Sequence, residues 1–226
     1  MGTRIGTGYA RAVPPDATAP THPVAHTRPF GSLQISYDER LLQPRDWTTA
    51  QSYWAADLMG TAPEGPVLEL CAGAGHIGLL AVATTPRDLV AVDVNPVACE
   101  YVARNAAAAG LVDRVEVRAG VIEDAIEPDE RFAVVIADPP WVPHVETPRF
   151  PEDPLLAIDG GDDGLAIARS CVRAIGHHLA PGGSAVLQLG NNQQVASLTG
   201  LFTESGLCVR ETRDYERGTL VRLDPV

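Results

Sequence analysis

Residues 67–78 read VLELCAGAGHIG, and this stretch decides the fold of the 226-residue chain. A short apolar run leads into a glycine-rich turn, and the turn leads into a second apolar run with helical spacing. This order is typical of the first strand, turn and helix of an open α/β sheet, where glycines allow a close approach of the backbone to a ligand. Ligands of such sheets bind beyond the carboxyl ends of the strands. The stretch therefore predicts an α/β fold with a binding site at this turn.

Apolar runs alternate with helical patterns along the rest of the chain. We expect strands at residues 67–70, 89–92, 115–118, 132–137, 185–189, 207–214 and 219–223, and helices at 76–84, 96–109, 163–179 and 193–205. Alternation of strands with helices predicts a parallel, doubly wound sheet. Only a short turn separates the last two strands, so one of them must run antiparallel to its neighbour.

The segment before this pattern divides into an arm and a short extension. Residues 1–29 are rich in Pro, Thr, Ala and Gly and lack hydrophobic periodicity, so we interpret them as an irregular arm that the fold does not need. Residues 32–37 alternate as a strand does, and we expect residues 41–43 to pair with them as a β-hairpin. Residues 47–59 have a helical pattern, with Asp46 as the expected N-cap.

The composition fits one folded domain, which we expect over residues 30–226, and excludes some functions. Hydrophobic residues make up 45% of the chain, and the formal net charge is −12. The negative charge argues against sequence-independent binding to nucleic acid, because such binding depends on neutralising phosphates. All 17 basic residues are Arg, so a lysine Schiff base or a lysine general base is excluded.

The cysteines and the hydropathy indicate a cytoplasmic protein without a metal. The four cysteines are far apart and form no C-x-x-C pair, so we expect neither a zinc site nor a disulfide framework. No apolar run is long enough to span a bilayer, and the amino-terminal residues contain no hydrophobic signal segment. We therefore expect no membrane partner, and the sequence does not indicate the oligomeric state.

The glycine-rich turn fits two kinds of cofactor. Gly73, Gly75 and Gly78 match the G-x-G-x-x-G pattern of dinucleotide-binding turns, which hold a diphosphate with free N–H groups and positive field. Counted from Glu69, the same letters match the acidic turn that holds S-adenosylmethionine (SAM). A carboxylate at Glu69 opposes a diphosphate but attracts the ammonium and sulfonium of SAM, so the turn favours SAM.

Asp93 ends the second strand, about twenty residues after the turn. An acid at this position commonly accepts hydrogen bonds from ribose hydroxyls. Both cofactor classes contain ribose, so Asp93 supports a nucleotide-like cofactor without separating them. A glycine turn and an N-cap Asp in a ligand-free domain remain the structural alternative.

The fourth strand is followed at once by Asp138-Pro139-Pro140-Trp141, and this motif favours methyl transfer to nitrogen. Neither proline can donate an N–H, so the Asp138 carboxylate and the Pro139 carbonyl present acceptors to one planar NH₂ group. Positive charge develops on that nitrogen during transfer, and an acceptor-lined site favours it. Trp141 can stack on a planar amide or base. The alternative is a strand-ending turn with a buried Trp.

These motifs resemble those of class I SAM-dependent methyltransferases, in the branch of the release-factor glutamine N5-methyltransferases. The resemblance covers about residues 42–223. VLELCAGAGHIGLLAV resembles the first motif of the family, VAVDVNP the second and VVIADPPWVP the fourth, while EDPLLAIDGGDDGL resembles a more specific segment. The resemblance implies a Rossmann-like sheet of seven strands with an antiparallel last strand. It implies SAM contacts at Glu69, Cys71, Ala72, Gly73, Gly75, Asp93, Val94, Gly120, Val121 and Asp138.

Three departures from the family motifs, together with the lack of a separate recognition domain, limit what the resemblance implies and leave the acceptor open. Cys71 replaces the first glycine of the turn, and Val121 stands where the family has an Asp near the adenine. Asp138 replaces the Asn of N-P-P-Y, and D-P-P-Y or D-P-P-W occurs in families that methylate exocyclic amines of nucleic-acid bases. About sixty residues stand where the release-factor enzymes have a separate recognition domain.

Other residues are weaker candidates. Arg45 lies in LLQPRDWT, which is similar to the P-R-x-x-T segment of the family, and either closes over the site or is a surface Arg. His76 at a helix start, and His144 as a proton acceptor, are both better explained without a catalytic role. The proline-rich residues 142–158, which we call the lid, are expected to form a lid or wall of the substrate site.

We predict a SAM-dependent N-methyltransferase that acts on an amide or amine nitrogen of a protein side chain or a small molecule. The first alternative is a base methyltransferase acting on RNA or DNA, against which the acidic charge and the lack of a nucleic-acid module count. The second is a non-catalytic protein that binds SAM or a nucleotide, in which Asp138 to Trp141 would be idle.

Overall fold

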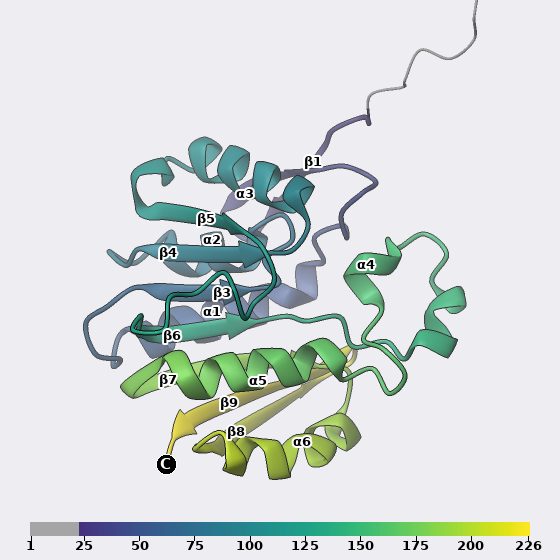
Figure 1. Ribbon diagram of the computed structural model, residues 1–226. Helices are drawn as coiled ribbons and strands as arrows, with labels where there is room; N and C mark the ends of the chain where they lie inside the picture. The colour runs from purple at the N-terminus through teal and green to yellow at the C-terminus, as the bar shows by residue number, and fades with distance from the viewer. Residues whose placement is uncertain (1–22) are drawn as a thin grey trace, which may run out of the picture.

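A computed structural model describes residues 23–226 and shows one mixed sheet with helices on both faces (Figure 1). The seven strands lie in the order β5-β4-β3-β6-β7-β9-β8. Their bounds are β3 (Val67–Leu70), β4 (Leu89–Asp93), β5 (Val115–Ala119), β6 (Phe132–Ala137), β7 (Leu179–Leu189), β8 (Leu207–Tyr215) and β9 (Gly218–Pro225). β9 runs antiparallel to both of its neighbours, and the remaining pairings are parallel. The predicted doubly wound sheet with one antiparallel strand is confirmed.

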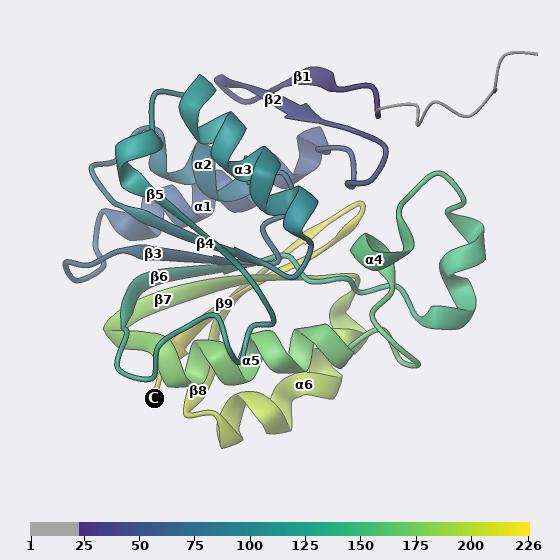
Figure 2. The same cartoon turned by 45° about the horizontal axis from the view of Figure 1, so that its top comes forward.

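Helices cover the sheet in two layers, which Figure 2 shows above and below the strands. One layer holds α1 (Thr49–Met59), α2 (His76–Val82) and α3 (Pro96–Ala108), and the other holds α5 (Ala166–His178) and α6 (Asn192–Glu204). Each layer packs its own cluster of buried apolar side chains against the sheet. β3 and β6 are buried along their whole length, as expected for central parallel strands that are covered on both faces.

Short elements connect the main ones. Short 3₁₀ helices span η1 (Asp46–Thr48), η2 (Val112–Arg114) and η3 (His144–Arg149), and a four-residue helix, α4, spans Leu155–Ile158. Both η3 and α4 belong to the lid. Figure 1 shows the lid standing beyond the carboxyl ends of the central strands, at the edge where ligands of α/β sheets bind.

The amino-terminal hairpin differs from the expected one. Residues 33–37 form β2 (Leu33–Tyr37) as predicted, but the partner is β1 (His26–Phe30), and residues 41–43 form no strand. Gly31 adopts the positive φ of 55° that the tight turn between the two strands requires. Residues 26–29 therefore belong to a strand and not to an irregular arm, whereas residues 1–22 of that arm lie outside the described part of the chain.

The chain after β2 is held by hydrogen bonds to α3. The buried carboxylate of Asp38 accepts bonds from the Tyr101 hydroxyl, at 2.9 Å, and from the Arg40 guanidinium, at 2.6 Å. The Asn105 side chain bonds the backbone N–H and the carbonyl of Ser36. Residues after Tyr37 thus turn back to α3 and cannot pair with β2. The expected N-cap was also wrong, because the Asp46 carboxylate instead accepts a bond from Arg28.

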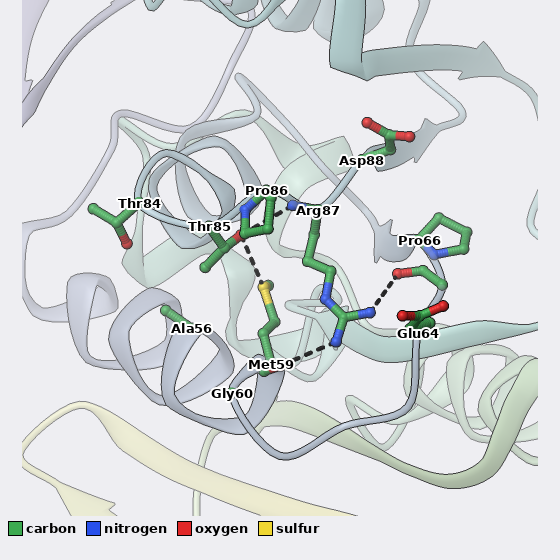
Figure 3. Close-up of a pocket in the computed structure, with 11 residues that line it drawn as sticks. Ala56, Met59, Gly60, Glu64, Pro66, Thr84, Thr85, Pro86, Arg87 and Asp88 are labelled. Carbon is green, nitrogen blue, oxygen red and sulfur yellow. Dashed lines mark hydrogen bonds between the residues drawn. The ribbon is translucent and has the colours of Figure 1, made fainter.

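Arg87 binds the loop between α1 and β3 at the amino-terminal edge of the sheet. Its guanidinium donates to the carbonyl oxygens of Pro63, Gly65, Met59 and Ala62, at 2.7, 3.1, 3.1 and 3.1 Å. Figure 3 shows this side chain inside a cavity of about 610 Å³. Because protein carbonyls already bind the cation, the role of Arg87 is structural, and this cavity lies at the end of the sheet opposite the lid.

Replacing Arg87 should therefore weaken the fold. We expect Arg87→Met to lower the free energy of unfolding by about 2 kcal/mol, because several carbonyl oxygens lose a charged donor. Urea denaturation measures the change. Arg217→Met, at an exposed turn position, serves as the matched control and should stay close to wild type. Equal stability of the two variants would show that the carbonyl cluster does not depend on Arg87.

Candidate active site

A cavity of about 660 Å³ lies at the carboxyl ends of β3, β4 and β6, beneath the lid. Most of the residues that the sequence singled out line it: Cys71, Ala72, Gly73, Asp93, Val94, Gly120, Val121, Asp138 and Pro140. Glu69, Gly75, Pro139 and Trp141 do not line it. The loops that the sequence singled out therefore meet at one cavity, although four of the named residues do not line it.

The glycine-rich turn after β3 contains three residues in the left-handed region. Cys71 has a φ of 58°, Gly73 a φ of 53° and Gly75 a φ of 76°. Cys71 is the one non-glycine residue with a positive φ among residues 23–226, and that conformation costs an L-residue roughly 1 kcal/mol. Its Sγ atom lies 4.0 Å from Sγ of Cys171 on α5. The small thiol thus replaces the family's glycine and takes part in the wall of the cavity.

Glu69 corrects one prediction, because its side chain does not face the cavity. The carboxyl group is buried under the turn, where Oε1 accepts a hydrogen bond from the Gly78 N–H at 2.8 Å. A Cβ atom on Gly78 would overlap Oε2 of Glu69, which explains the third glycine of the motif. Burial raises the pKa of Glu69 to about 8, and the charges of Asp93 and Asp138 add to the shift. Glu69 therefore joins α2 to β3 and does not supply a charge to a cofactor.

Asp93 is fixed at the end of β4 by two backbone donors. Its Oδ2 accepts a hydrogen bond from the Gly73 N–H and its Oδ1 accepts one from the Asn95 N–H, both at 2.8 Å. Burial raises the pKa of this carboxyl group. A carboxylate held in this way still has free lone pairs toward the cavity, as binding to the two hydroxyls of a ribose requires.

Apolar side chains continue the cavity beside Asp93. Val94 and Val121 are exposed valines that line it, from the segments that follow β4 and β5. The Gly120 N–H donates to the Asp93 carbonyl oxygen at 3.0 Å and so fixes these two segments side by side. An apolar surface next to a ribose-binding carboxylate suits a planar base.

Asp138 lies on the opposite side of the same cavity, directly after β6. Its carboxyl group is half-buried and accepts no hydrogen bond from any residue that the structure describes. Burial raises the pKa of Asp138 to about 7. An unpartnered, desolvated carboxylate that lines a cavity can accept hydrogen bonds from a ligand without giving up a bond that the fold needs.

The backbone around Asp138 is rigid. The Gln51 side chain on α1 donates to the carbonyl oxygens of Ala137 and Val186, at 2.9 and 3.1 Å. After the two prolines, the Trp141 carbonyl oxygen accepts a bond from Gln194 at 2.9 Å. The Trp141 ring packs over Gly190, where a Cβ would lie 2.6 Å from Cε3. Trp141 thus anchors the loop to the segment after β7. This position does not favour the predicted stacking of the Trp141 ring on the acceptor group.

The charge of the cavity decides between the two cofactors that the glycine turn fits. Four carboxylates line it, from Asp93, Asp138, Asp159 and Glu123, and Arg40 is the one Arg among the lining residues that the structure describes. This balance opposes a diphosphate and favours a cofactor that carries positive charge, such as the sulfonium and ammonium of SAM. The lining residues therefore fit SAM better than a dinucleotide. The carboxylates that favour SAM are the four in the cavity lining, and Glu69 is not one of them.

The weaker candidates occupy defined places. His76 lines the cavity with its ring edge-on to Phe30, and burial lowers the pKa of His76 to about 4. His144 Nδ1 lies 2.6 Å from Oδ2 of Asp159, which raises the pKa of His144, and this ring does not line the cavity. Arg45 does not line it either and instead forms an ion pair with Asp153 in the lid.

Sequence reasoning missed several lining or supporting residues. Leu41 and Leu42 line the cavity from the chain after the hairpin, whereas Leu155 and Leu156 line it from the lid, which was expected to border the site. Gln51 lies in the middle of a predicted helix, where nothing in the local pattern indicates that its amide supports β6. Leu41, Leu42 and Gln51 are remote in sequence from the glycine-rich turn and from Asp138, and only tertiary packing brings them to the site.

Neither a metal centre nor a membrane span is present in the part of the chain that the structure describes. No group of three or more His, Cys, Asp or Glu side chains is arranged to hold a metal ion within residues 23–226. None of the helices in that range has the length and apolar character that crossing a bilayer requires.

Comparison with known proteins places this chain among methyltransferases. A family model described as "Methyltransferase domain" matches residues 67–152. The chain is 32% identical to the release factor glutamine methyltransferase of Xylella fastidiosa over 202 residues, covering 86% of this chain and 73% of that protein. It is 32% identical to the ribosomal protein uL3 glutamine methyltransferase of Bradyrhizobium diazoefficiens over 199 residues, covering 81% of this chain.

The matched region spans only part of some relatives. It covers 61% of the Bradyrhizobium protein and 44% of the uL3 glutamine methyltransferase of Bordetella pertussis. Solved structures share the fold at lower identity. A methyltransferase from Pyrococcus furiosus has a TM-score of 0.65 at 19% identity, covering 87% of this chain and 91% of that one. A ribosomal protein L11 methylase from Lactobacillus delbrueckii has a TM-score of 0.62 at 13% identity, covering 83% of each chain.

The geometry makes a binding prediction that separates Asp93 from Glu69. The chain should bind S-adenosylhomocysteine in calorimetry and should not bind NAD. Asp93→Ala should weaken S-adenosylhomocysteine binding by about 1–3 kcal/mol, because an acceptor for the ribose is lost. Glu69→Gln keeps a similar shape under the turn and should bind within about twofold of wild type, since Glu69 does not line the cavity. Wild-type affinity in Asp93→Ala, or binding of NAD alone, would contradict this assignment.

Proposed function

The chain belongs to the release factor glutamine methyltransferase family, and on that premise we propose that it transfers the methyl group of SAM to the side-chain amide nitrogen of a protein. Glutamine is the acceptor to test first, because the names of its relatives specify glutamine in a release factor or in ribosomal protein uL3. A small-molecule amide or amine is the broader possibility that the sequence leaves open.

One observation carries the proposal. The unpartnered carboxyl group of Asp138 and the fixed carboxylate of Asp93 line the same cavity. The Asp93 side of the cavity, with Gly73, Val94 and Val121, suits the adenosine of SAM. The Asp138 side suits the acceptor. A protein that only bound SAM would have no need of a second, desolvated carboxyl group across the cavity.

The residues have separate roles in this proposal. SAM, when bound, supplies the electrophilic methyl group. Asp93 and the backbone of Gly73 and Gly120 hold the nucleoside. Asp138 accepts a hydrogen bond from the acceptor NH₂ group. The Pro139 carbonyl, which does not line the cavity itself but lies between the lining residues Asp138 and Pro140, is the second acceptor that we propose. The buried Pro139 and the half-buried Pro140 have no N–H that could compete for these acceptors.

Asp138 can do more than the Asn of the family's motif. The acceptor nitrogen gains positive charge as it is methylated and must lose a proton. An ionised Asp138 stabilises that charge and can take the proton, and a pKa near 7 suits a proton acceptor that works at neutral pH. Trp141 and Gln51 hold the loop so that the carboxylate keeps its direction.

Substitution of Asp138 separates catalysis from cofactor binding. Asp138→Ala should bind S-adenosylhomocysteine within about threefold of wild type but lose turnover by about 10²-fold or more, because an unheld NH₂ group rarely points its lone pair at the methyl group. Asp138→Asn should keep part of the activity if the acceptor is an amide. Label transfer from methyl-labelled SAM measures both variants. Full activity in Asp138→Ala would show that the Asp138 to Trp141 motif has only a structural role.

The pH profile gives a second test of the same residue. The pKa of Asp138 is raised to about 7, and the active form is the ionised one. Turnover should therefore rise between about pH 6 and about pH 8 and level off above that range. Asp138→Asn cannot ionise, so its residual turnover should lose this rise. A wild-type profile that is flat over the range, or an equal rise in Asp138→Asn, would argue against proton acceptance by Asp138.

Identification of the acceptor distinguishes the alternatives. Protein, nucleic acid and small-molecule fractions are incubated with the chain and methyl-labelled SAM, and the products are analysed by mass spectrometry. A methylated glutamine in a protein supports the proposal. Label in RNA or DNA alone would indicate the base methyltransferase, and binding of SAM without any product would indicate a non-catalytic protein.

A further inference from the structure

The two ends of the lid are hydrogen-bonded to each other and to the residues that directly follow the lid. The Val142 N–H donates to the Ile158 carbonyl oxygen at 3.0 Å, and the Gly160 N–H donates to the Val142 carbonyl oxygen at 2.9 Å. His144 and Asp159 add a side-chain bond of 2.6 Å at the same place. A loop whose ends are joined in this way can move as a unit about these ends, which we call its roots.

One ion pair ties the middle of the lid to the body of the domain. Arg45 Nη2 lies 2.6 Å from Oδ1 of Asp153, across 108 positions of sequence. The Asp153 side chain is 11% exposed and that of Arg45 is 30% exposed. Among the hydrogen bonds and ion pairs of residues 23–226, it is the one side-chain contact from residues 145–157 to a residue outside the lid.

The position of this pair relates it to the shape of the cavity. Arg45 follows Leu42 by three residues, and Asp153 precedes Leu155 by two. Leu41 and Leu42 form one apolar part of the cavity wall, and Leu155 and Leu156 form another. Leu155 and Leu156 are themselves exposed on the lid, so packing of these two side chains alone holds the lid weakly. The ion pair thus lies close in sequence to both apolar parts of the cavity wall.

We propose that Arg45 and Asp153 form a latch that holds the lid closed over the cavity and sets the distance between its two apolar walls. They are positioning residues and do not line the cavity. When the latch opens, the lid moves about its roots, and the cavity widens for ligands to enter and leave. This inference concerns the lid alone and stands whether or not the proposed methyl acceptor is correct.

Limited proteolysis with trypsin tests the latch. Arg149 is an exposed Arg in the lid, and the chain contains no Lys. Arg45→Ala and Asp153→Ala should each speed cleavage after Arg149 by roughly fivefold, the effect of losing a half-buried ion pair on local opening. The same variants should release S-adenosylhomocysteine faster in stopped-flow measurements. Wild-type rates of cleavage and release in both variants would overturn the latch.

Two further variants control for other causes. Asp46→Ala breaks the ion pair with Arg28, one residue from Arg45, without touching the lid, and should be cleaved after Arg149 at the wild-type rate. The exchanged pair Arg45→Asp with Asp153→Arg should restore most of the protection. The arginine introduced by this exchange would directly precede Pro154, so trypsin gains no site there. Cleavage of the exchanged pair as fast as that of the single variants would contradict the proposal.

Hydrogen exchange distinguishes lid opening from general unfolding. The amides of Phe150 and Asp153 are bonded within the lid and should exchange faster in Arg45→Ala, while amides of β6 keep their wild-type protection. Equal acceleration in the lid and in β6 would show that Arg45 stabilises the whole domain, and would overturn a specific latch.

Discussion

The carboxylate of Asp93 accepts hydrogen bonds from the N–H groups of Gly73 and Asn95, and the candidate site depends on this interaction. It joins the turn after β3 to the end of β4, so two neighbouring strands present their loops at a fixed separation. The Gly120 N–H adds the segment after β5 to the same arrangement. In the proposed function, the lone pairs that remain on Asp93 face the nucleoside, and Asp138 faces the acceptor.

The two ends of the cavity use carboxyl groups in opposite ways. Asp93 is held by backbone donors, whereas Asp138 has no donor among the described residues, and burial raises its pKa to about 7. Glu69, which the motif suggested as a third charge, lies under the turn with a pKa of about 8. Leaving a half-buried carboxyl group without a hydrogen-bond donor is unfavourable for the fold. In the proposed function, the acceptor NH₂ group supplies the donor that Asp138 lacks.

The sequence predicted the features that depend on local patterns, namely the strands, the helices and the edge of the sheet at which the cavity lies. Apolar strands that end in glycine or Asp located the cavity, because the carboxyl ends of parallel strands meet at one edge of the sheet. The direction of Glu69 was not predictable, since β3 is buried on both faces and has no polar side to indicate where a side chain points. The strand at residues 26–30 was missed because it contains polar residues and Pro29. The Arg45–Asp153 pair joins residues 108 positions apart, a distance at which no local pattern acts.

A crystal structure of the chain with S-adenosylhomocysteine would test the central claim most directly, namely that one cavity holds both the cofactor and the acceptor nitrogen. The account predicts ribose hydroxyls within hydrogen-bond distance of Asp93, the base beside Val94 and Val121, and the sulfur atom facing the Asp138 carboxyl group. S-adenosylhomocysteine bound elsewhere, or bound with its sulfur turned away from Asp138, would contradict it.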